Sequence, residues 1–253
     1  MNTFSLTGDM IYKGNLVLVN RDHPYCEAQT KGNFMPIRAV MDDVILDSYA
    51  ARAYTSIMEE LCAWDKITAV SGWRSREEQE RIYNDSLKEN GEDFTAKYVA
   101  VPGHSEHQTG FALDLALALE NIDFLTPHFP HTGVCADFRK LAGRYGFVER
   151  YPEGKEGITG IAHEPWHFRY VGAPHAMLMD QFGDTLEEYH ERLKQFVHGS
   201  KPLLHDFGSK RIEISYLAAG KRGAGFAIED DAICKVSGNN MDGFIITVWK
   251  DKD

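Results

Sequence analysis

The sequence predicts an α+β fold, and three features of the chain indicate it. An apolar stripe at helical spacing predicts a helix from about Asp43 to Trp64, with these residues on its buried face: Ala50, Ala53, Ile57, Leu61 and Trp64. The run FALDLALAL, from Phe111 to Leu119, is typical of a buried strand. After Gly199 the chain changes to short β-like runs separated by Gly, Asn and Asp. These features predict an α+β domain over residues 1–199 and a β-rich appendage over residues 200–253.

Further elements are expected between these features. Ile67–Val70 (ITAV) predicts a short strand, and Ser75 with Glu78 fits an S-x-x-E capping box that predicts a helix from Arg76 to about Lys88. The other expected elements are a helix over 136–145 stopped by Gly146, strands at FVER and IAHEPWHFRYV, a helix begun by Asp184 and Glu187 that ends near Val197, and C-terminal strands at RIEISYLA, GFAIED, AICKV and FIITVW.

Composition limits the class of protein. The 253 residues are 43% hydrophobic, as in ordinary globular proteins, and the net charge of −11 opposes general binding to nucleic acid or to an anionic membrane. No apolar run is long enough to span a membrane, and the N-terminus lacks the features of a secretory signal. We therefore expect a cytoplasmic protein without a membrane anchor. The four cysteines are widely scattered, so we expect reduced core residues.

Asp114 is a carboxylate inside an apolar run, where a charge is costly to bury unless it is paired or bound to a metal. His107 precedes it in the segment PGHSEHQTGFALDL, and a turn containing Gly110 could bring the two side chains to one cation. Imidazole nitrogen and carboxylate oxygen are both normal zinc ligands. Taken alone, however, Asp114 could pair with an arginine and His107 could lie on the surface, so a third ligand is needed.

The segment His163–His167 offers that ligand in two ways. It matches HExxH, in which two histidines share one face of a zinc-binding helix, and Glu187 stands where some such enzymes keep a third ligand. Pro165 argues against a helix here, because it lacks an N–H and pushes Glu164 toward extended backbone. We therefore favour Glu164 as a base and His167 as a ligand on an extended segment. Three protein ligands (His107, Asp114 and His167) would leave one zinc position open for water, as in catalytic sites.

These residues resemble a known family. Ser105–Asp114 (SEHQTGFALD) fits S-x-H-x-x-G-x-A-x-D, and Glu164–His167 (EPWH) fits the second motif of the lysostaphin/D-Ala-D-Ala/sonic-hedgehog (LAS) type zinc peptidases. With SGWRS at Ser71–Ser75, the chain most resembles the VanY and VanXY D,D-peptidases of vancomycin resistance over about residues 35–180. The resemblance implies a small antiparallel sheet flanked by helices, which would make residues 1–199 the zinc D,D-peptidase domain.

The resemblance also implies the roles of the site residues. One zinc ion per chain would bind His107, Asp114 and His167, with Glu164 as general base and acid. Arg74 would stabilise the oxyanion, in keeping with the permanent charge of a guanidinium. Gln79 and Ser105 are candidates for holding the substrate's carboxylate or backbone, and Trp166 for a pocket wall. His104 and His163 are expected near the site but not as ligands.

The implied substrates are the D-Ala-D-Ala dipeptide and the pentapeptide end of the peptidoglycan precursor, whose terminal D-Ala the enzyme would remove. One alternative is a cell-wall endopeptidase of the same family, such as a lysin. Another is a non-enzymatic, zinc-stabilised interaction protein. The sequence predicts neither the oligomeric state nor the role of residues 200–253.

Overall fold

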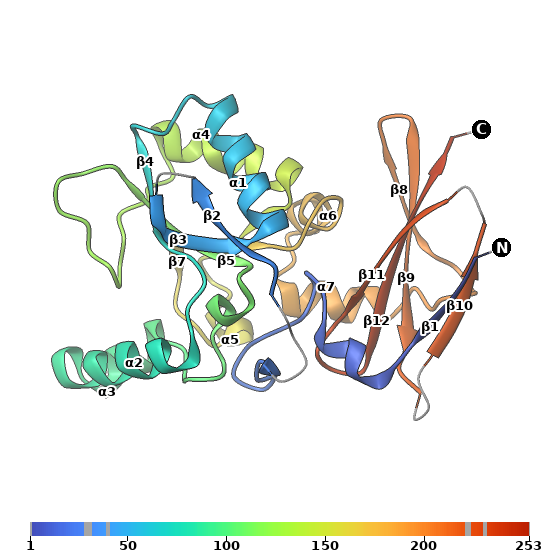
Figure 1. Ribbon diagram of the computed structural model, residues 1–253, viewed down its shortest axis with the longest axis horizontal. Coiled ribbons are helices and arrows are strands. Elements are labelled where there is room, and N and C mark those ends of the chain that lie inside the picture. Colours follow the sequence, from blue (N-terminus) through green and yellow to red (C-terminus); the bar gives the residue numbers. More distant parts are fainter. Residues whose placement is uncertain (1, 28–31, 39–40, 221–223, 230–231, 253) are drawn as a thin grey trace. The chain divides into compact units, whose positions relative to one another are not determined.

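The computed structural model describes residues 2–27, 32–38, 41–220, 224–229 and 232–252 (Figure 1). It divides into two compact units, which we call the central unit (Val19–Tyr25 and Lys31–Thr185) and the terminal unit (Met1–Leu18, Cys26–Thr30 and Leu186–Asp253). The predicted boundary lay between residues 199 and 200, whereas the terminal unit already includes the chain from Leu186 onward. Residues 186–199 and the N-terminal strand group with the C-terminal strands.

The central unit is built on a four-stranded antiparallel sheet. Its strand order is β4-β5-β7-β6, with β4 at Ile67–Ser71, β5 at Ala112–Leu117, β6 at Phe147–Tyr151 and β7 at Glu164–Tyr170. Each strand was predicted from its β-branched, aromatic and apolar residues. The small antiparallel sheet expected from the family resemblance is thus confirmed.

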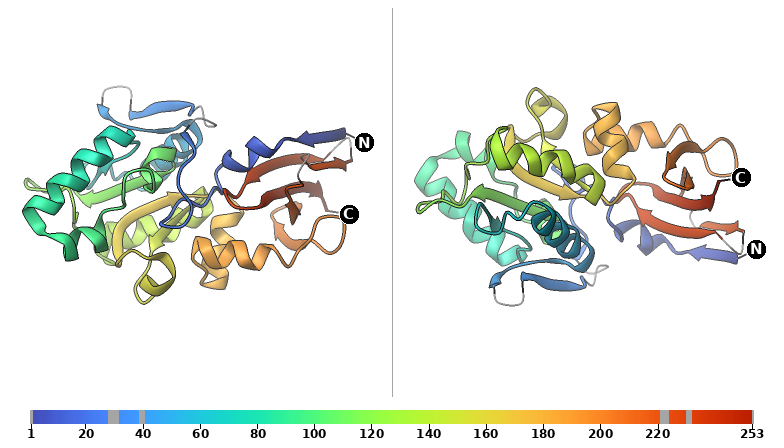
Figure 2. Two further views of the ribbon diagram at one scale, coloured as in Figure 1. Left: turned by 90° about the horizontal axis from the view of Figure 1, so that it is seen from below. Right: turned by 90° about the horizontal axis from the view of Figure 1, so that it is seen from above.

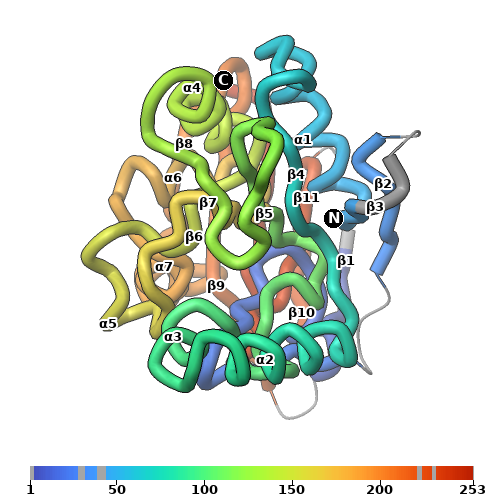
Figure 3. The backbone as a smooth tube through the Cα atoms, turned by 90° about the vertical axis from the view of Figure 1, so that its left-hand side faces the viewer, coloured from blue at the N-terminus to red at the C-terminus, as the bar shows by residue number. Residues whose placement is uncertain are grey.

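Two helices cover one face of this sheet. Helix α1 (Ser48–Glu60) and helix α4 (Gly133–Ala142) lie side by side in Figures 1 and 3. Their apolar side chains join those of the strands in one core cluster, whose fully buried members include Tyr54, Ile57, Leu113, Leu115, Phe138 and Phe168. Burial of these side chains is the main stabilising contribution of this unit.

Strand alternation determines which residues lie on the other face of the sheet. Successive side chains of a strand point to opposite faces, so Asp114 lies opposite to its core neighbours Leu113 and Leu115. On the adjacent strand, His167 stands in the same relation to Phe168. Asp114 and His167 are direct cross-strand partners, so the sheet itself places the two predicted ligands next to each other.

The remaining elements of the central unit lie around this layer. They are a hairpin of β2 (Phe34–Arg38) and β3 (Met41–Asp47), helices α2 (Arg76–Asn90), α3 (Glu92–Tyr98), α5 (Glu156–Thr159) and α6 (His175–Phe182), and short 3-10 turns η3 (Glu106–Thr109) and η4 (Gly143–Tyr145). Ser75 is confirmed as the N-cap of α2, since its hydroxyl accepts from the Glu78 amide at 3.1 Å. The predicted start of the first helix is wrong: residues 43–47 belong to β3, and Asp47 caps α1 by accepting from the Tyr49 amide.

The terminal unit is strand-rich, as predicted for the C-terminal region. A four-stranded antiparallel sheet has the order β11-β12-β9-β8, formed by Ile233–Gly238, Gly243–Asp251, Lys210–Ala218 and Leu203–Phe207. Strand β1 (Asn2–Leu6), at the other end of the chain, pairs with β10 (Ala224–Ile228), and Figure 2 shows it among the C-terminal strands. The strand predicted at GFAIED (residues 225–230) ends at Ile228 in the structure. The last residue of the predicted segment, Asp230, lies outside the described residues.

Two shorter segments complete the terminal unit. A 3-10 turn, η1, spans Gly8–Tyr12, and helix α7 spans Leu186–Leu193. Helix α7 ends before the predicted Val197, which instead forms an isolated bridge with Tyr216 of β9.

The cysteines and the helix lengths can be compared with what the composition predicted. All four cysteines are free thiols; Cys135 is buried as expected, but Cys62 is exposed. Among the described residues, no helix combines the length and the apolar character needed to cross a membrane.

Candidate active site

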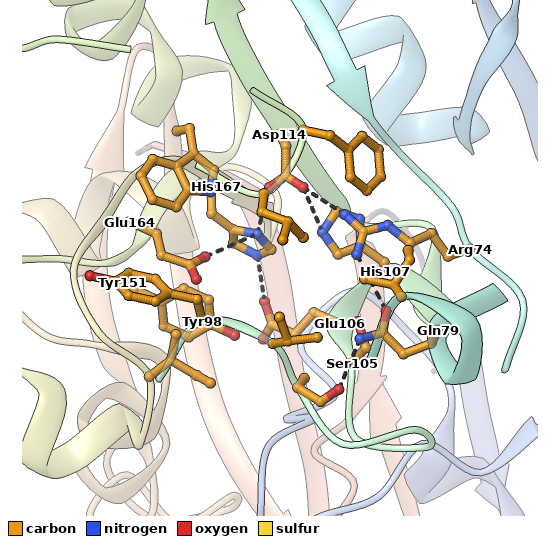
Figure 4. Close-up of a pocket in the computed structure, with 17 residues that line it drawn as sticks. Arg74, Gln79, Tyr98, Ser105, Glu106, His107, Asp114, Tyr151, Glu164 and His167 are labelled. Carbon is orange, nitrogen blue, oxygen red and sulfur yellow. Dashed lines mark hydrogen bonds and ion pairs between the residues drawn. The ribbon is translucent and has the colours of Figure 1, made fainter. Parts of the chain in front are cut away.

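The three predicted metal ligands converge on one point (Figure 4). His107 lies in η3 and Gly110 ends this turn in left-handed backbone, which leads the chain directly into β5 and Asp114. His107 Nε2 lies 3.1 Å from Asp114 Oδ2, and His167 Nδ1 lies 2.8 Å from Asp114 Oδ1. All three side chains are buried. The arrangement brings two imidazole nitrogens and one carboxylate together, which is a donor set that suits zinc.

The tautomer of His107 supports a cation at this point. Its Nδ1 lies 2.6 Å from the Gly72 carbonyl oxygen, a contact that requires the proton on Nδ1. Burial and the neighbouring Arg74 lower the pKa of His107 below its ordinary value, so the ring is neutral and Nε2 carries a lone pair. That lone pair and the Asp114 carboxylate, which also accepts from Arg74, are electron-pair donors that a divalent ion can bind together. The residues therefore fit a divalent metal.

His167 presents its other nitrogen to a residue that the sequence did not single out. Its Nε2 is 3.6 Å from Glu106 Oε2, and neither atom has a hydrogen-bond partner among the described residues. When the ring is neutral, a proton on Nε2 leaves the Nδ1 lone pair directed at Asp114. Burial opposes a charge on this ring, but Asp114 and Glu106 outweigh it and raise the pKa of His167 to about 9.

Glu106 itself is held by two arginines. Its Oε1 is 2.8 Å from Arg150 Nε and 2.8 Å from Arg169 Nη1, and all three side chains are fully buried. Burial opposes ionisation, but the two guanidinium groups keep the pKa of Glu106 well below its ordinary value. The carboxylate beside His167 is therefore fixed in place and charged. Its position inside the motif, directly before His107, was the available sequence signal.

Glu164 is the first residue of β7, and its side chain lines the same pocket as the three candidate ligands. Its Oε2 lies 3.8 Å from His167 Nδ1. Burial raises the pKa of Glu164 to about 8, and the negative charges of Asp114 and Glu106 add to the effect. A carboxyl group whose pKa is close to neutral can both accept and donate a proton at physiological pH.

Arg74 is buried and lies across Asp114 from His167. Its guanidinium donates to Asp114 Oδ2 at 2.8 Å, to the Ser71 hydroxyl at 2.7 Å and to Gln79 Oε1 at 3.3 Å. The Gln79 amide in turn donates to the Ala100 carbonyl at 2.8 Å. Gln79 thus connects Arg74 to the loop after α3. The arginine pairing that the sequence left open for Asp114 is also present, with Arg74 as the partner.

A pocket opens over these groups. Ser105 and Trp166, both buried, line it together with Tyr98, Phe124, Tyr151 and the residues already described. His163 points away from the ligands, toward Glu149, and His104 contacts the Asn20 carbonyl through Nδ1. Because residues 164–170 form a strand, His163 and His167 do not share a helix face. The structure thus does not have the helical HExxH arrangement.

The sequence model of the VanY family, described as D-alanyl-D-alanine carboxypeptidase, matches residues 44–173. The chain belongs to this family. It is 40% identical over 183 residues to the bifunctional D-Ala-D-Ala dipeptidase and carboxypeptidase VanXYC of Enterococcus gallinarum, covering 72% of this chain and 96% of that one. It is 30% identical over 258 residues to a D-alanyl-D-alanine carboxypeptidase of Enterococcus faecium, covering 97% and 78% of the two chains.

Solved structures agree with the fold of this VanY-family chain. The D,D-dipeptidase VanXYg, crystallised with a D-Ala-D-Ala phosphinate analog, has a TM-score of 0.95 at 44% identity and covers 98% of this chain and 99% of its own. A mutant of the D,D-pentapeptidase VanY from the VanB-type resistance cassette, in complex with Zn(II), has a TM-score of 0.56 at 28% identity and covers 70% and 98%. The predicted VanY/VanXY-type peptidase is therefore confirmed as family and fold.

Proposed function

We propose that this chain is a zinc-dependent D,D-dipeptidase and D,D-carboxypeptidase. It would hydrolyse free D-Ala-D-Ala and remove the terminal D-Ala of the peptidoglycan precursor pentapeptide, and so confer vancomycin resistance. The observation that carries this proposal is the convergence of His107, Asp114 and His167 beside a buried Glu164. The activities named for VanXYC and VanXYg support the choice of substrate.

One zinc ion per chain would be held by His107 Nε2, the Asp114 carboxylate and His167 Nδ1. When bound, zinc supplies positive charge that activates a water and polarises the scissile carbonyl. Glu106 orients His167 for this role through the other ring nitrogen, as carboxylates commonly do for metal-binding histidines. The Zn(II) in the VanY complex supports the choice of metal.

Glu164 would handle the proton. Its carboxylate accepts a proton from the attacking water and then delivers it to the nitrogen of the leaving D-Ala, whose amide bond breaks. Both transfers occur within one buried site, so the proton is retained between the two steps. The raised pKa of Glu164 suits the second step, because a group that holds its proton near neutral pH is available as an acid.

Arg74 would stabilise the oxyanion that forms on the substrate carbonyl. Its guanidinium is kept in position by Ser71 and Gln79, and such preorganised donors are worth most in a buried pocket. Ser105 would hold the substrate backbone or carboxylate, and Gln79 would contribute through the amide N–H that Ala100 does not use. Trp166 would form a wall of the pocket.

A product assay tests the proposal. Purified protein with zinc is incubated with D-Ala-D-Ala, with precursor pentapeptide and, separately, with cross-linked wall peptide. Release of D-Ala from the first two substrates is expected. Cleavage of the cross-linked peptide alone would indicate the lysin-like endopeptidase, and no product from any substrate would favour the zinc-stabilised interaction protein.

The Glu164→Ala variant separates catalysis from metal binding. We expect the rate of D-Ala release to fall by about 10²–10⁴-fold, because general acid–base catalysis is lost. Zinc content, measured by elemental analysis, should stay that of the unmodified protein. Loss of zinc from this variant would show that Glu164 is a ligand and that its proposed role is wrong.

A cytoplasmic location would place the enzyme where it meets both the dipeptide and the precursor pentapeptide before export.

A further inference from the structure

A second group of metal-binding side chains lies outside the candidate active site. His131 precedes α4, Glu149 lies on β6, and His163 directly precedes β7. His131 Nε2 is 3.1 Å from Glu149 Oε2, and His163 Nε2 is 3.3 Å from Glu149 Oε1. Among the described residues, this group and the catalytic one are the two in which three such donor atoms lie within 4.8 Å of one another.

The spacing of these atoms suits a tetrahedral ion. Zinc ligands stand about 2.0–2.1 Å from the metal, so two ligands of a tetrahedral site are roughly 3.3 Å apart. The two Nε2 atoms lie 3.1 and 3.3 Å from different oxygens of the Glu149 carboxylate, which is close to the separation of two zinc ligands, and the second distance is long for a hydrogen bond. The two imidazole rings are stacked, with centroids 5.9 Å apart and planes at 24°. Both rings present Nε2 to the same carboxylate.

Arg139 of α4 holds the three segments together. Its guanidinium donates to Glu149 Oε2 at 2.7 Å, to the Phe129 carbonyl at 3.0 Å and to the Pro130 carbonyl at 2.9 Å. It also donates to the Pro165 carbonyl. These carbonyls belong to the residues that directly precede His131 and closely follow His163. The two histidines are therefore presented on backbone that is already fixed, which lowers the conformational cost of binding an ion.

The charge and exposure of the group indicate how an ion would bind. Water competes with an ion at this exposed group more than at the buried catalytic ligands, so the affinity should be lower. The side chain of His131 is 54% exposed and that of His163 is 28% exposed. An ion at this point would keep contact with water and would exchange with the solvent.

We propose that His131, Glu149 and His163 form a second, weaker site for a divalent transition metal such as zinc. An ion there joins the segment before α4 to the segment that leads into Glu164, which also carries Ile161 of the pocket lining. This inference is independent of the proposed peptidase activity, because the six residues of the two groups are all different.

Metal stoichiometry tests this site. Untagged full-length protein is stripped of metal and dialysed against increasing zinc, and bound metal is measured by elemental analysis. Two equivalents per chain are expected for the unmodified protein, the second at higher zinc concentration. His131→Ala and His163→Ala should each keep the tight equivalent and lose the weak one. His128→Ala, which removes an exposed histidine of the same loop, should keep both.

A second readout guards against variants that fail to fold. Thermal unfolding followed by circular dichroism should show that the weak equivalent raises the midpoint of the unmodified protein and of His128→Ala, but not of His131→Ala. One equivalent in the unmodified protein at saturating zinc would overturn the proposal and assign the group to hydrogen bonding alone. Equal loss of the weak equivalent in His128→Ala would also overturn it, since binding would then be nonspecific.

Discussion

At the scale of single residues, Glu106 shows how a variable position within the motif affects the protonation of a neighbouring histidine, His167. The sequence predicted that His107, Asp114 and His167 would converge beside Glu164, because their spacing follows a specific motif. It did not single out Glu106, because a glutamate next to a histidine has no distinctive pattern of its own. Its role depends on Arg150 of β6 and Arg169 of β7, which bind the carboxylate and hold it near His167.

Replacing Glu106 by glutamine should weaken zinc binding. The amide is nearly isosteric but cannot accept from His167 as an anion, so we expect the zinc affinity to fall by about 10–100-fold. Two buried guanidinium groups also lose their counter-charge, which should cost about 3–5 kcal/mol of unfolding free energy. Competition with a chelator of known affinity measures the first effect, and urea unfolding measures the second.

A matched control uses Glu120, which is exposed in the structure. Glu120→Gln should change neither zinc affinity nor stability. If folded Glu106→Gln protein bound zinc as tightly as the control, Glu106 would have only a structural role.

Zinc uptake should release a proton from His167. In the metal-free protein, Asp114 and Glu106 outweigh the effect of burial and raise the pKa of this ring to about 9, so the ring is protonated at pH 7. Zinc requires the Nδ1 lone pair and must displace that proton. The apparent zinc affinity should therefore rise by about tenfold per pH unit from pH 6 to 8 and level off above about 9. His107, whose pKa is lowered, should contribute nothing over this range.

Calorimetric titration in buffers of different ionisation enthalpy measures the protons released. Release of about one proton at pH 7 is expected from the group at His167. An affinity that does not change between pH 6 and 8 would show that His167 is already neutral before zinc binds.

At the scale of elements, helices and strands with a local sequence signal were predicted well, whereas strands that pair with distant parts of the chain were not. Helix α2 was predicted almost to the residue, because its capping box lies within four residues of sequence. Residues 43–47 were assigned to a helix because their strand partner, β2, is recognised only from the fold. Strand β1 was missed for the same reason: Leu6 pairs with Ala224, more than two hundred residues away.

The turn between His107 and Asp114 depends on Gly110. This residue has a φ of +74°, and a Cβ there would lie 2.5 Å from the Phe34 ring and 3.0 Å from the Asp47 nitrogen. Gly183 offers a matched control, since its φ is +66° but no atom lies within 4 Å of its Cβ position. Substitution by alanine thus carries the left-handed backbone cost at both positions and a steric clash only at Gly110.

We expect Gly183→Ala to lower the unfolding free energy by about 1–2 kcal/mol, the cost of left-handed backbone in a non-glycine residue. Gly110→Ala should cost on the order of 1–3 kcal/mol more, because Phe34 must move. It should also weaken zinc binding, since the turn positions one ligand against the other. Urea unfolding and zinc competition measure these effects. Equal losses of stability in the two variants would show that the turn at Gly110 tolerates a side chain.

At the scale of the whole molecule, the catalytic groups and the strand-rich region belong to different units. Every proposed site residue lies between Arg74 and His167, within the central unit, and so does the core cluster that supports the sheet. The terminal unit has its own core, which includes Leu6, Phe226, Phe244 and Ile246. The alignment with VanXYC covers 72% of this chain, so part of the chain has no counterpart in that relative.

A fragment of residues 19–185 should therefore fold and retain the catalytic site. We expect it to bind zinc and to release D-Ala from the dipeptide with a kcat/KM within about tenfold of the full chain, a difference of about 1.4 kcal/mol. The same fragment with Glu164→Ala is the control and should bind zinc without turnover. A fragment that is folded by circular dichroism, holds zinc and yet lacks activity would show that the terminal unit contributes to catalysis. Its strands would then have a function beyond their own stability.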